Sequence, residues 1–142
     1  MNTKSNAAAA RIIRAGSNMT NTVGMKIAEA TLIVHAETVR AVAKQSAGER
    51  QIRYNPRREV IVSKPGDTPN VDFGVFLRSI QFEVDPQKNV GFVGSNDKRG
   101  PWFEFGTRTM APRPWLSVGF GNARKEVVKL FREIKFKIDD KK

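Results

Sequence analysis

The segment from Gly100 to Leu116 constrains the fold more than any other part of the chain. It reads Gly-Pro-Trp-Phe-Glu-Phe-Gly-Thr-Arg-Thr-Met-Ala-Pro-Arg-Pro-Trp-Leu and holds both tryptophans of the 142-residue sequence, two of its nine phenylalanines and three of its seven prolines. Proline fixes the backbone angle φ, and large aromatic side chains favour burial. The segment therefore predicts a fixed shape with apolar anchors, and nothing in it has the character of a reactive centre.

Proline and glycine positions within this segment predict two helix starts with an extended link between them. Proline suits the first position of a helix and glycine the position after its end, so we expect a short helix from Pro101 to Gly106. Pro112 and Pro114 disfavour helical geometry in the residues that precede them, which makes 110–113 extended. Pro114 is then well placed to open the next helix.

Two amphipathic helices are predicted by apolar residues that recur every three or four positions. The first runs from Thr20 to about Ser46, and the second begins at Leu116. The apolar face of the first consists of Val23, Ile27, Ala30, Val34 and Ala41, with Thr38 in the gap. The apolar face of the second consists of Leu116, Phe120, Ala123, Val127, Leu130 and Ile134.

Alternating residues predict strands in the middle of the chain. The clearest strand is 79–85, in which Ile80, Phe82 and Val84 share one face, and a return strand follows around Phe92. Before it, residues 49–70 form an extended excursion that we interpret as a strand or hairpin arm followed by a stiff, proline-containing loop.

Together these elements predict an α+β fold, in which a small antiparallel sheet is packed by a long N-terminal helix and a C-terminal helix. We assign residues 1–17 to a flexible N-terminal tail and residues 18–142 to a single domain. A chain of this length is long enough to bury one core but not two of comfortable size.

The chain is strongly basic, with 25 lysines and arginines against 14 acidic residues and a net charge of +11. Such a charge attracts polyanions, either nucleic acid or the acidic face of a protein partner, although a solvated basic surface explains it equally well. The candidate polyanion contacts are Arg53, Arg57, Arg58, Lys98 and Arg99. A small basic nucleic-acid-binding module is therefore the alternative function, although no known nucleic-acid-binding signature accompanies the charge.

Residues for catalysis or metal binding are scarce. The chain has no cysteine and a single histidine, His35, which we interpret as a helix-surface or interface residue. Glu83 and Asp85 share a strand face, where a solvated polar face explains them more simply than a metal or acid–base pair. Glu104, among aromatic residues, needs a partner, and we expect a structural role as a cap or in an ion pair with Arg108 or Arg113. We therefore expect no enzyme, no cofactor and no bound metal.

Three sequence blocks appear in a defined order. The first is Ser63-Lys64-Pro65-Gly66-Asp67 followed by Val71-Asp72-Phe73-Gly74-Val75-Phe76-Leu77-Arg78-Ser79-Ile80. The second is Pro101-Trp102-Phe103-Glu104-Phe105-Gly106-Thr107, and the third is Met110-Ala111-Pro112-Arg113-Pro114-Trp115-Leu116, which runs into a charged helix. In this order and spacing, the blocks resemble the tail-completion, or tail-component, proteins of long-tailed double-stranded DNA bacteriophages.

The resemblance implies a non-enzymatic virion protein that forms a homo-oligomeric ring, with sixfold symmetry expected, at the head–tail junction. It implies the tail tube protein and the head connector or stopper proteins as partners, nonspecific contact with passing DNA, and host cytoplasm as the place of assembly. No membrane partner is expected, because no apolar run reaches the length of a membrane span. The candidate interface residues are Trp102, Phe103, Glu104, Phe105, Arg113, Pro114 and Trp115.

Overall fold

The computed structural model describes residues 3–72 and 74–134, with side-chain exposure from Ala10 onward. Its elements in chain order are α1 (Thr3–Ala43), β1 (Glu49–Tyr54), β2 (Arg57–Val62), α2 (Val75–Arg78), β3 (Ile80–Asp85), β4 (Val90–Ser95), α3 (Arg99–Phe105) and α4 (Leu116–Arg132). This order confirms the α+β class. The first two residues of the expected tail, Phe73 of the first block and residues 135–142 lie outside the described residues.

The N-terminal helix is longer than the apolar spacing predicts. α1 runs without interruption from Thr3 to Ala43, so the predicted helix start near Thr20 is wrong, and the helix also ends before the expected Ser46. The alanine run 7–10 explains the early start, because alanine has the highest helix propensity and no proline interrupts the segment. Forty-one helical residues give α1 a length of about 62 Å. The flexibility of residues 1–17 stays a prediction.

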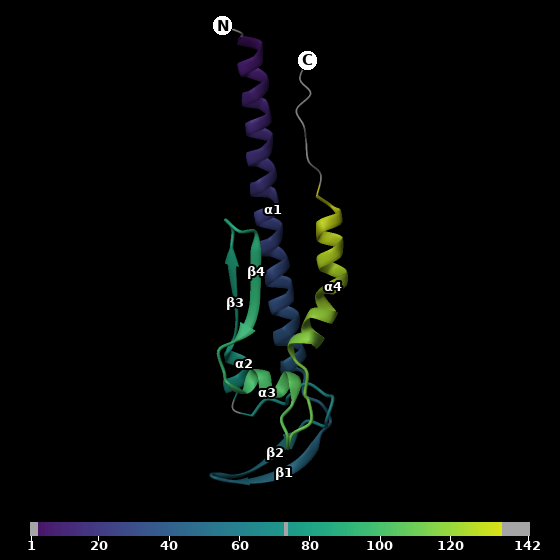
Figure 1. Ribbon diagram of the computed structural model, residues 1–142. Helices are drawn as coiled ribbons and strands as arrows, with labels where there is room; N and C mark the ends of the chain where they lie inside the picture. The colour runs from purple at the N-terminus through teal and green to yellow at the C-terminus, as the bar shows by residue number, and fades with distance from the viewer. Residues whose placement is uncertain (1–2, 73, 135–142) are drawn as a thin grey trace.

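α1 is the central element of the molecule. The β3–β4 hairpin packs along one side of it and α4 along another, whereas the β1–β2 hairpin lies at the end of the body near the C-terminus of α1 (Figure 1). The predicted apolar face is confirmed where these elements cover it, since Ala30, Val34, Thr38 and Ala41 are buried. The hydroxyl of Thr38 donates to the carbonyl oxygen of Val34 at 2.7 Å, which satisfies this polar atom inside the core.

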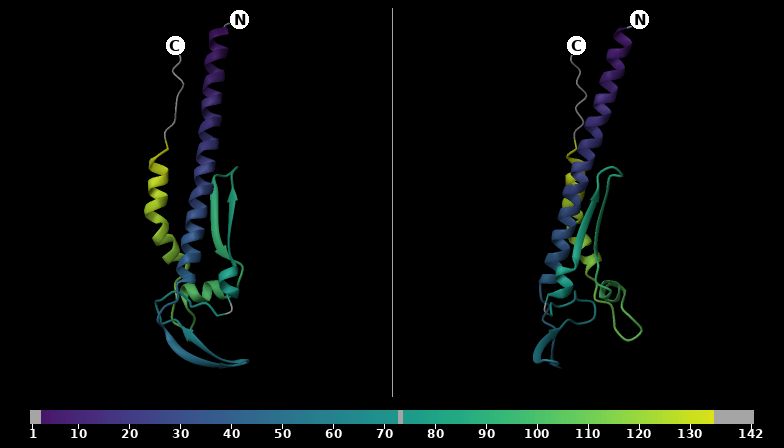
Figure 2. Two further views of the ribbon diagram at one scale, coloured as in Figure 1. Left: turned by 180° about the vertical axis from the view of Figure 1, so that it is seen from behind. Right: turned by 90° about the vertical axis from the view of Figure 1, so that its left-hand side faces the viewer.

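The strands form two separate hairpins rather than the single sheet that the sequence predicts. β1 pairs with β2, and β3 pairs with β4, both antiparallel. The β3–β4 hairpin confirms the predicted strand and its return, and β3 meets α1 where His35 lies beside Phe82. Every residue of β1 is exposed, because this hairpin curves away from the body (Figures 1 and 2). The β3–β4 hairpin lies along the side of α1 and the β1–β2 hairpin beyond its C-terminal end, so the two form separate sheets.

The densest part of the core lies at the C-terminal end of α1. Val42, Phe76, Ile80 and Trp115 form its buried cluster, which draws on α1, α2, β3 and the residue before α4. Phe76 contacts Trp115 edge-on with ring centroids 5.1 Å apart, a favourable geometry for aromatic pairs. The first and third family-like blocks therefore meet inside the core.

The predicted apolar face of α4 is confirmed in part. Ala123 and Leu130 are buried, but Phe120 is exposed, so its assignment to the core face is wrong. Gly119 takes its place against α1, where an added Cβ would lie 2.2 Å from the Thr38 hydroxyl oxygen. A close helix crossing at a glycine leaves no room for a phenylalanine ring, which explains why Phe120 turns outward.

Candidate assembly interface

The Gly100–Leu116 segment is held in shape by contacts that cross between its two halves. The predicted end of the short helix is confirmed, because Gly106 follows α3 with a φ of 76°. Both predicted helix starts are wrong by two residues: α3 begins at Arg99 rather than Pro101, and α4 at Leu116 rather than Pro114. At each start, backbone N–H groups donate hydrogen bonds to a nearby carboxylate, Asp97 for α3 and Glu104 for α4, and proline spacing does not reveal these bonds.

Trp115 lies in the core rather than on a contact surface. Its side chain is 3% exposed, and its indole N–H donates to the carbonyl oxygen of Gly100 at 2.9 Å. Phe103 is half-buried and packs edge-on against Phe76. Because both side chains fill the monomer's interior, neither provides the exposed ring that an intersubunit anchor requires.

Glu104 caps the N-terminus of α4. Its Oε2 accepts hydrogen bonds from the backbone N–H groups of Trp115 at 2.8 Å and Leu116 at 2.9 Å, and its Oε1 accepts from Ser117 at 3.1 Å. Burial raises the pKa of this carboxyl, but hydrogen bonds from the Ser117 side chain and from the three backbone groups outweigh it and hold the pKa below its ordinary value. The capping role is confirmed, with backbone N–H groups as partners in place of Arg108 or Arg113.

Arg113 belongs to the same internal brace, and the neighbouring Pro114 is half-buried. The Nε of Arg113 donates to the carbonyl oxygen of Ser63 at 3.1 Å, and its backbone N–H donates to that of Phe103 at 2.7 Å. Of the candidate interface residues, only Trp102 and Phe105 are exposed large hydrophobics, with Phe105 79% exposed. Most of the predicted interface residues therefore pack inside the monomer, and of these residues only Trp102 and Phe105 have exposed side chains.

An uncovered, mostly apolar groove of 930 Å³ lies between β4 and α4, over one face of α1. We call it the α1–α4 groove. Its exposed aromatic lining consists of Phe92, Phe105, Phe120 and Phe131, which are 37–79% exposed. Among the described residues, the charged side chains of the lining are Glu104 and Arg124. Of these four phenylalanines, only Phe105 is among the interface residues that the sequence predicts. Phe131 falls outside the apolar spacing of α4, which is the signal that marks it as outward-facing.

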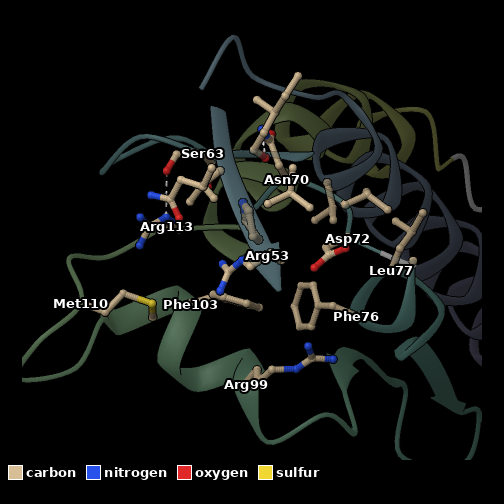
Figure 3. A pocket seen from close by; sticks show the side chains of 18 residues that line it. Arg53, Ser63, Asn70, Asp72, Phe76, Leu77, Arg99, Phe103, Met110 and Arg113 are labelled. Atoms are coloured by element: carbon tan, nitrogen blue, oxygen red, sulfur yellow. Dashed lines mark hydrogen bonds between the residues drawn. The ribbon is translucent and has the colours of Figure 1, made fainter. Parts of the chain in front are cut away.

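A second cavity, of 410 Å³, lies under the β1–β2 hairpin. Figure 3 shows Arg53, Arg99 and Arg113 around a floor that includes Phe76 and Phe103. Two nearby carboxylates are paired with arginines, of which Arg99 lines the cavity and Arg58 does not. Asp72 accepts both hydrogen bonds from the Nη2 of Arg58, and the Arg99 side chain beside Asp97 lowers the pKa of that carboxyl to about 2.

The five predicted polyanion contacts therefore divide into two groups. Arg58 and Arg99 are held by carboxylates within the molecule. Arg53, Arg57 and Lys98 are exposed and form no ion pair within residues 3–72 and 74–134. Arg53 and Arg57 lie on the β1–β2 hairpin, whereas Lys98 precedes α3, so the free cations do not form one continuous patch on a single element.

Comparisons with protein-family models, with curated proteins and with solved structures find no significant match to this chain. The site is therefore interpreted from its own geometry.

Other chemistry within the described residues is limited. His35 is half-buried, and its Nε2 lies 3.3 Å from the carbonyl oxygen of Ile80, in keeping with a packing role between α1 and β3. Among residues 3–72 and 74–134, no cluster of three or more histidine, aspartate or glutamate side chains is arranged to hold a metal ion. None of the helices in this part of the chain has the length and hydropathy to span a membrane.

Proposed function

We propose that this protein is a non-enzymatic component of a long-tailed phage virion that assembles into a ring at the head–tail junction. There the ring joins the tail tube to the head connector or stopper proteins, with six copies as the expected stoichiometry. Two lines of support carry the proposal. The three sequence blocks resemble tail-completion proteins, and the monomer leaves a large aromatic groove uncovered.

The α1–α4 groove is the observation that favours assembly most directly. Monomeric proteins rarely leave extended apolar patches in water, and contiguous exposed aromatics mark contact surfaces. Phe92, Phe105 and Phe120 come from three different elements and converge on this one groove. Stability of the monomer does not account for this convergence, because each ring is more than half exposed and contributes little to the core.

The family-like blocks support the proposal in a second way. Trp115, Glu104 and Arg113 hold the body together through Gly100, the α4 N-terminus and Ser63. A rigid body of this kind presents the groove in a fixed shape, which reduces the entropic cost of assembly.

A reconstitution experiment tests the proposed place in the virion. Purified full-length protein is added to tails that lack it, and their ability to join filled heads is scored by negative-stain electron microscopy. We expect joined particles with a ring of extra density between tail and connector. Tails that join heads equally well without the protein would contradict the proposal.

The β1–β2 hairpin favours nucleic-acid binding as the second candidate function. Arg53 and Arg57 flank its turn without carboxylate partners among the described residues, and Tyr54 between them is exposed. A freestanding module of this kind predicts binding to DNA that weakens steeply as salt rises. DNA binding that does not weaken as salt rises, or that is equally strong in an Arg53→Gln, Arg57→Gln variant, would exclude this candidate.

A further inference from the structure

The apolar face of α1 continues beyond the body that covers it. Ala30 and Val34 on this face are buried beneath α4 and the β3–β4 hairpin. At 100° per residue, Met19 and Ile12 fall on the same face, about three and five turns before Ala30. Yet Ile12 is 73% exposed and Met19 43% exposed. The same stripe is thus buried in one half of the helix and bare in the other.

The bare half of α1 has no covering element among the described residues. Figures 1 and 2 show it projecting past the tip of the β3–β4 hairpin and past the end of α4. An isolated helical segment is only marginally stable in water, and an apolar stripe on it adds an unfavourable exposed surface. A helix with this pattern is stabilised when the stripe is buried against a second surface.

The chain itself carries a surface of matching character. The α1–α4 groove is lined by exposed aromatic rings, and its volume of 930 Å³ accommodates several apolar side chains of one helix face. Helix-in-groove recognition uses such a pairing, with side chains at spacings of three, four and seven residues as anchors. Ile12 and Met19 have the seven-residue spacing.

We infer that the exposed N-terminal part of α1, residues 10–21, docks into the α1–α4 groove of a second copy of this chain. The inference rests on the proposed ring and assigns its subunit contact. Because helix and groove are different surfaces, the contact is heterologous and leaves one free helix and one free groove on each dimer. Repetition of such a contact closes into a ring when the rotation between neighbours allows it.

Charge favours this pairing over contact between two N-terminal halves. Arg11 and Arg14 lie on this segment, and the chain has no acidic residue before Glu29. Side-by-side packing of two such helices brings like charges together, whereas the groove lining carries one cation, Arg124, and one anion, Glu104. Pairing of helix with helix also leaves the groove uncovered.

A complementation experiment with full-length variants tests the contact. The helix variant carries Ile12→Gln and Met19→Gln, because glutamine keeps helix propensity while it removes the apolar surface. The groove variant carries Phe92→Thr and Phe120→Gln, both at positions where the ring is 58% exposed. The matched controls are Met25→Gln on the opposite side of α1 and Val128→Gln on α4 outside the groove. Unchanged circular dichroism and melting temperature confirm that each variant folds.

Native mass spectrometry gives the readout. We expect rings from the wild type and both controls, monomers from each variant alone, and a one-to-one heterodimer when the two variants are mixed. The heterodimer forms because the helix variant keeps an intact groove and the groove variant keeps an intact helix.

Five other outcomes would overturn the inference. Rings that persist in either variant, or wild-type rings with no heterodimer on mixing, leave the ring proposal intact but assign the contact elsewhere. Dimers of the groove variant alone point to pairing of two N-terminal halves. A chain ending at Ile134 that associates more strongly than the full chain shows that residues 135–142 cover the face within one molecule. A wild type that stays monomeric at all concentrations removes the contact together with the proposed ring.

Discussion

The carboxylate of Glu104 joins two helices that are separated by an irregular link. Glu104 lies on α3, and its carboxylate reaches the N-terminus of α4. There three backbone N–H groups donate hydrogen bonds to its two oxygens. The first turn of α4 contains no acidic residue of its own, so Glu104 supplies the negative charge that favours the positive end of the helix dipole. At this position, a single residue determines where α4 begins.

Glu104→Gln is expected to lower stability by about 1–2 kcal/mol at neutral pH, because the amide loses the charge and one of the acceptor oxygens of the cap. Since the folded-state pKa of Glu104 lies below its ordinary value of 4.5, its contribution is complete above that value and is lost as pH falls through the folded-state pKa. Urea unfolding of wild type and variant over an acidic pH series measures the difference. A difference that grows as pH falls below 4.5 would contradict the assignment.

Trp115→Ala is expected to destabilise the fold by about 3–5 kcal/mol, because the indole ring fills the core beside Phe76 and its N–H satisfies the Gly100 carbonyl. Thermal and urea unfolding measure the loss. Trp102→Ala is the matched control, since Trp102 is about half exposed and its loss is expected to cost less than about 1 kcal/mol. Equal effects of the two substitutions would show that Trp115 does not anchor the core.

At the scale of elements, the contact between α1 and α4 depends on a glycine. A Cβ at Gly119 would lie 2.2 Å from the Thr38 hydroxyl oxygen and 2.5 Å from the Thr38 Cα, whereas a Cβ at Gly121 would meet nothing within 4 Å. Both glycines are in the same helix, two residues apart. The pair therefore separates the effect of helix packing from that of helix propensity.

Gly119→Ala is expected to cost about 1–3 kcal/mol, since α4 must move away from α1 to admit the methyl group. Gly121→Ala is expected to raise stability by about 0.5–1 kcal/mol, because alanine is the better helix former and the site is open. Chemical unfolding of both variants checks the signs. Two changes of the same sign would show that α4 does not cross α1 at Gly119.

The same elements show how far sequence reasoning reaches. Local patterns predicted the buried face of α1 around Thr38, the β3–β4 hairpin and the helix end at Gly106, because periodicity and glycine geometry act over a few residues. The outward turn of Phe120, the separation of the two hairpins and the bonds made by Glu104 were not predictable. Each depends on contacts between segments that are far apart in the chain, and local residue spacing does not predict such contacts.

At the scale of the whole molecule, the proposed assembly uses bare apolar surfaces at two different places. The groove lies beside the body, and the N-terminal half of α1 extends beyond it (Figure 2). Sequence analysis predicted a contact protein but placed the contact on the Gly100–Leu116 segment, most of which is internal. The exposed rings of the groove and the stripe of α1 are the surfaces on which the proposed assembly depends.

The native mass of the purified full-length protein tests this assembly most directly. We predict a closed oligomer of one defined stoichiometry, with six copies expected. This oligomer remains a ring on dilution and does not form a series of open chains of different lengths. A strict monomer at every concentration, alone and in the presence of tail tube and connector proteins, would contradict the proposed ring.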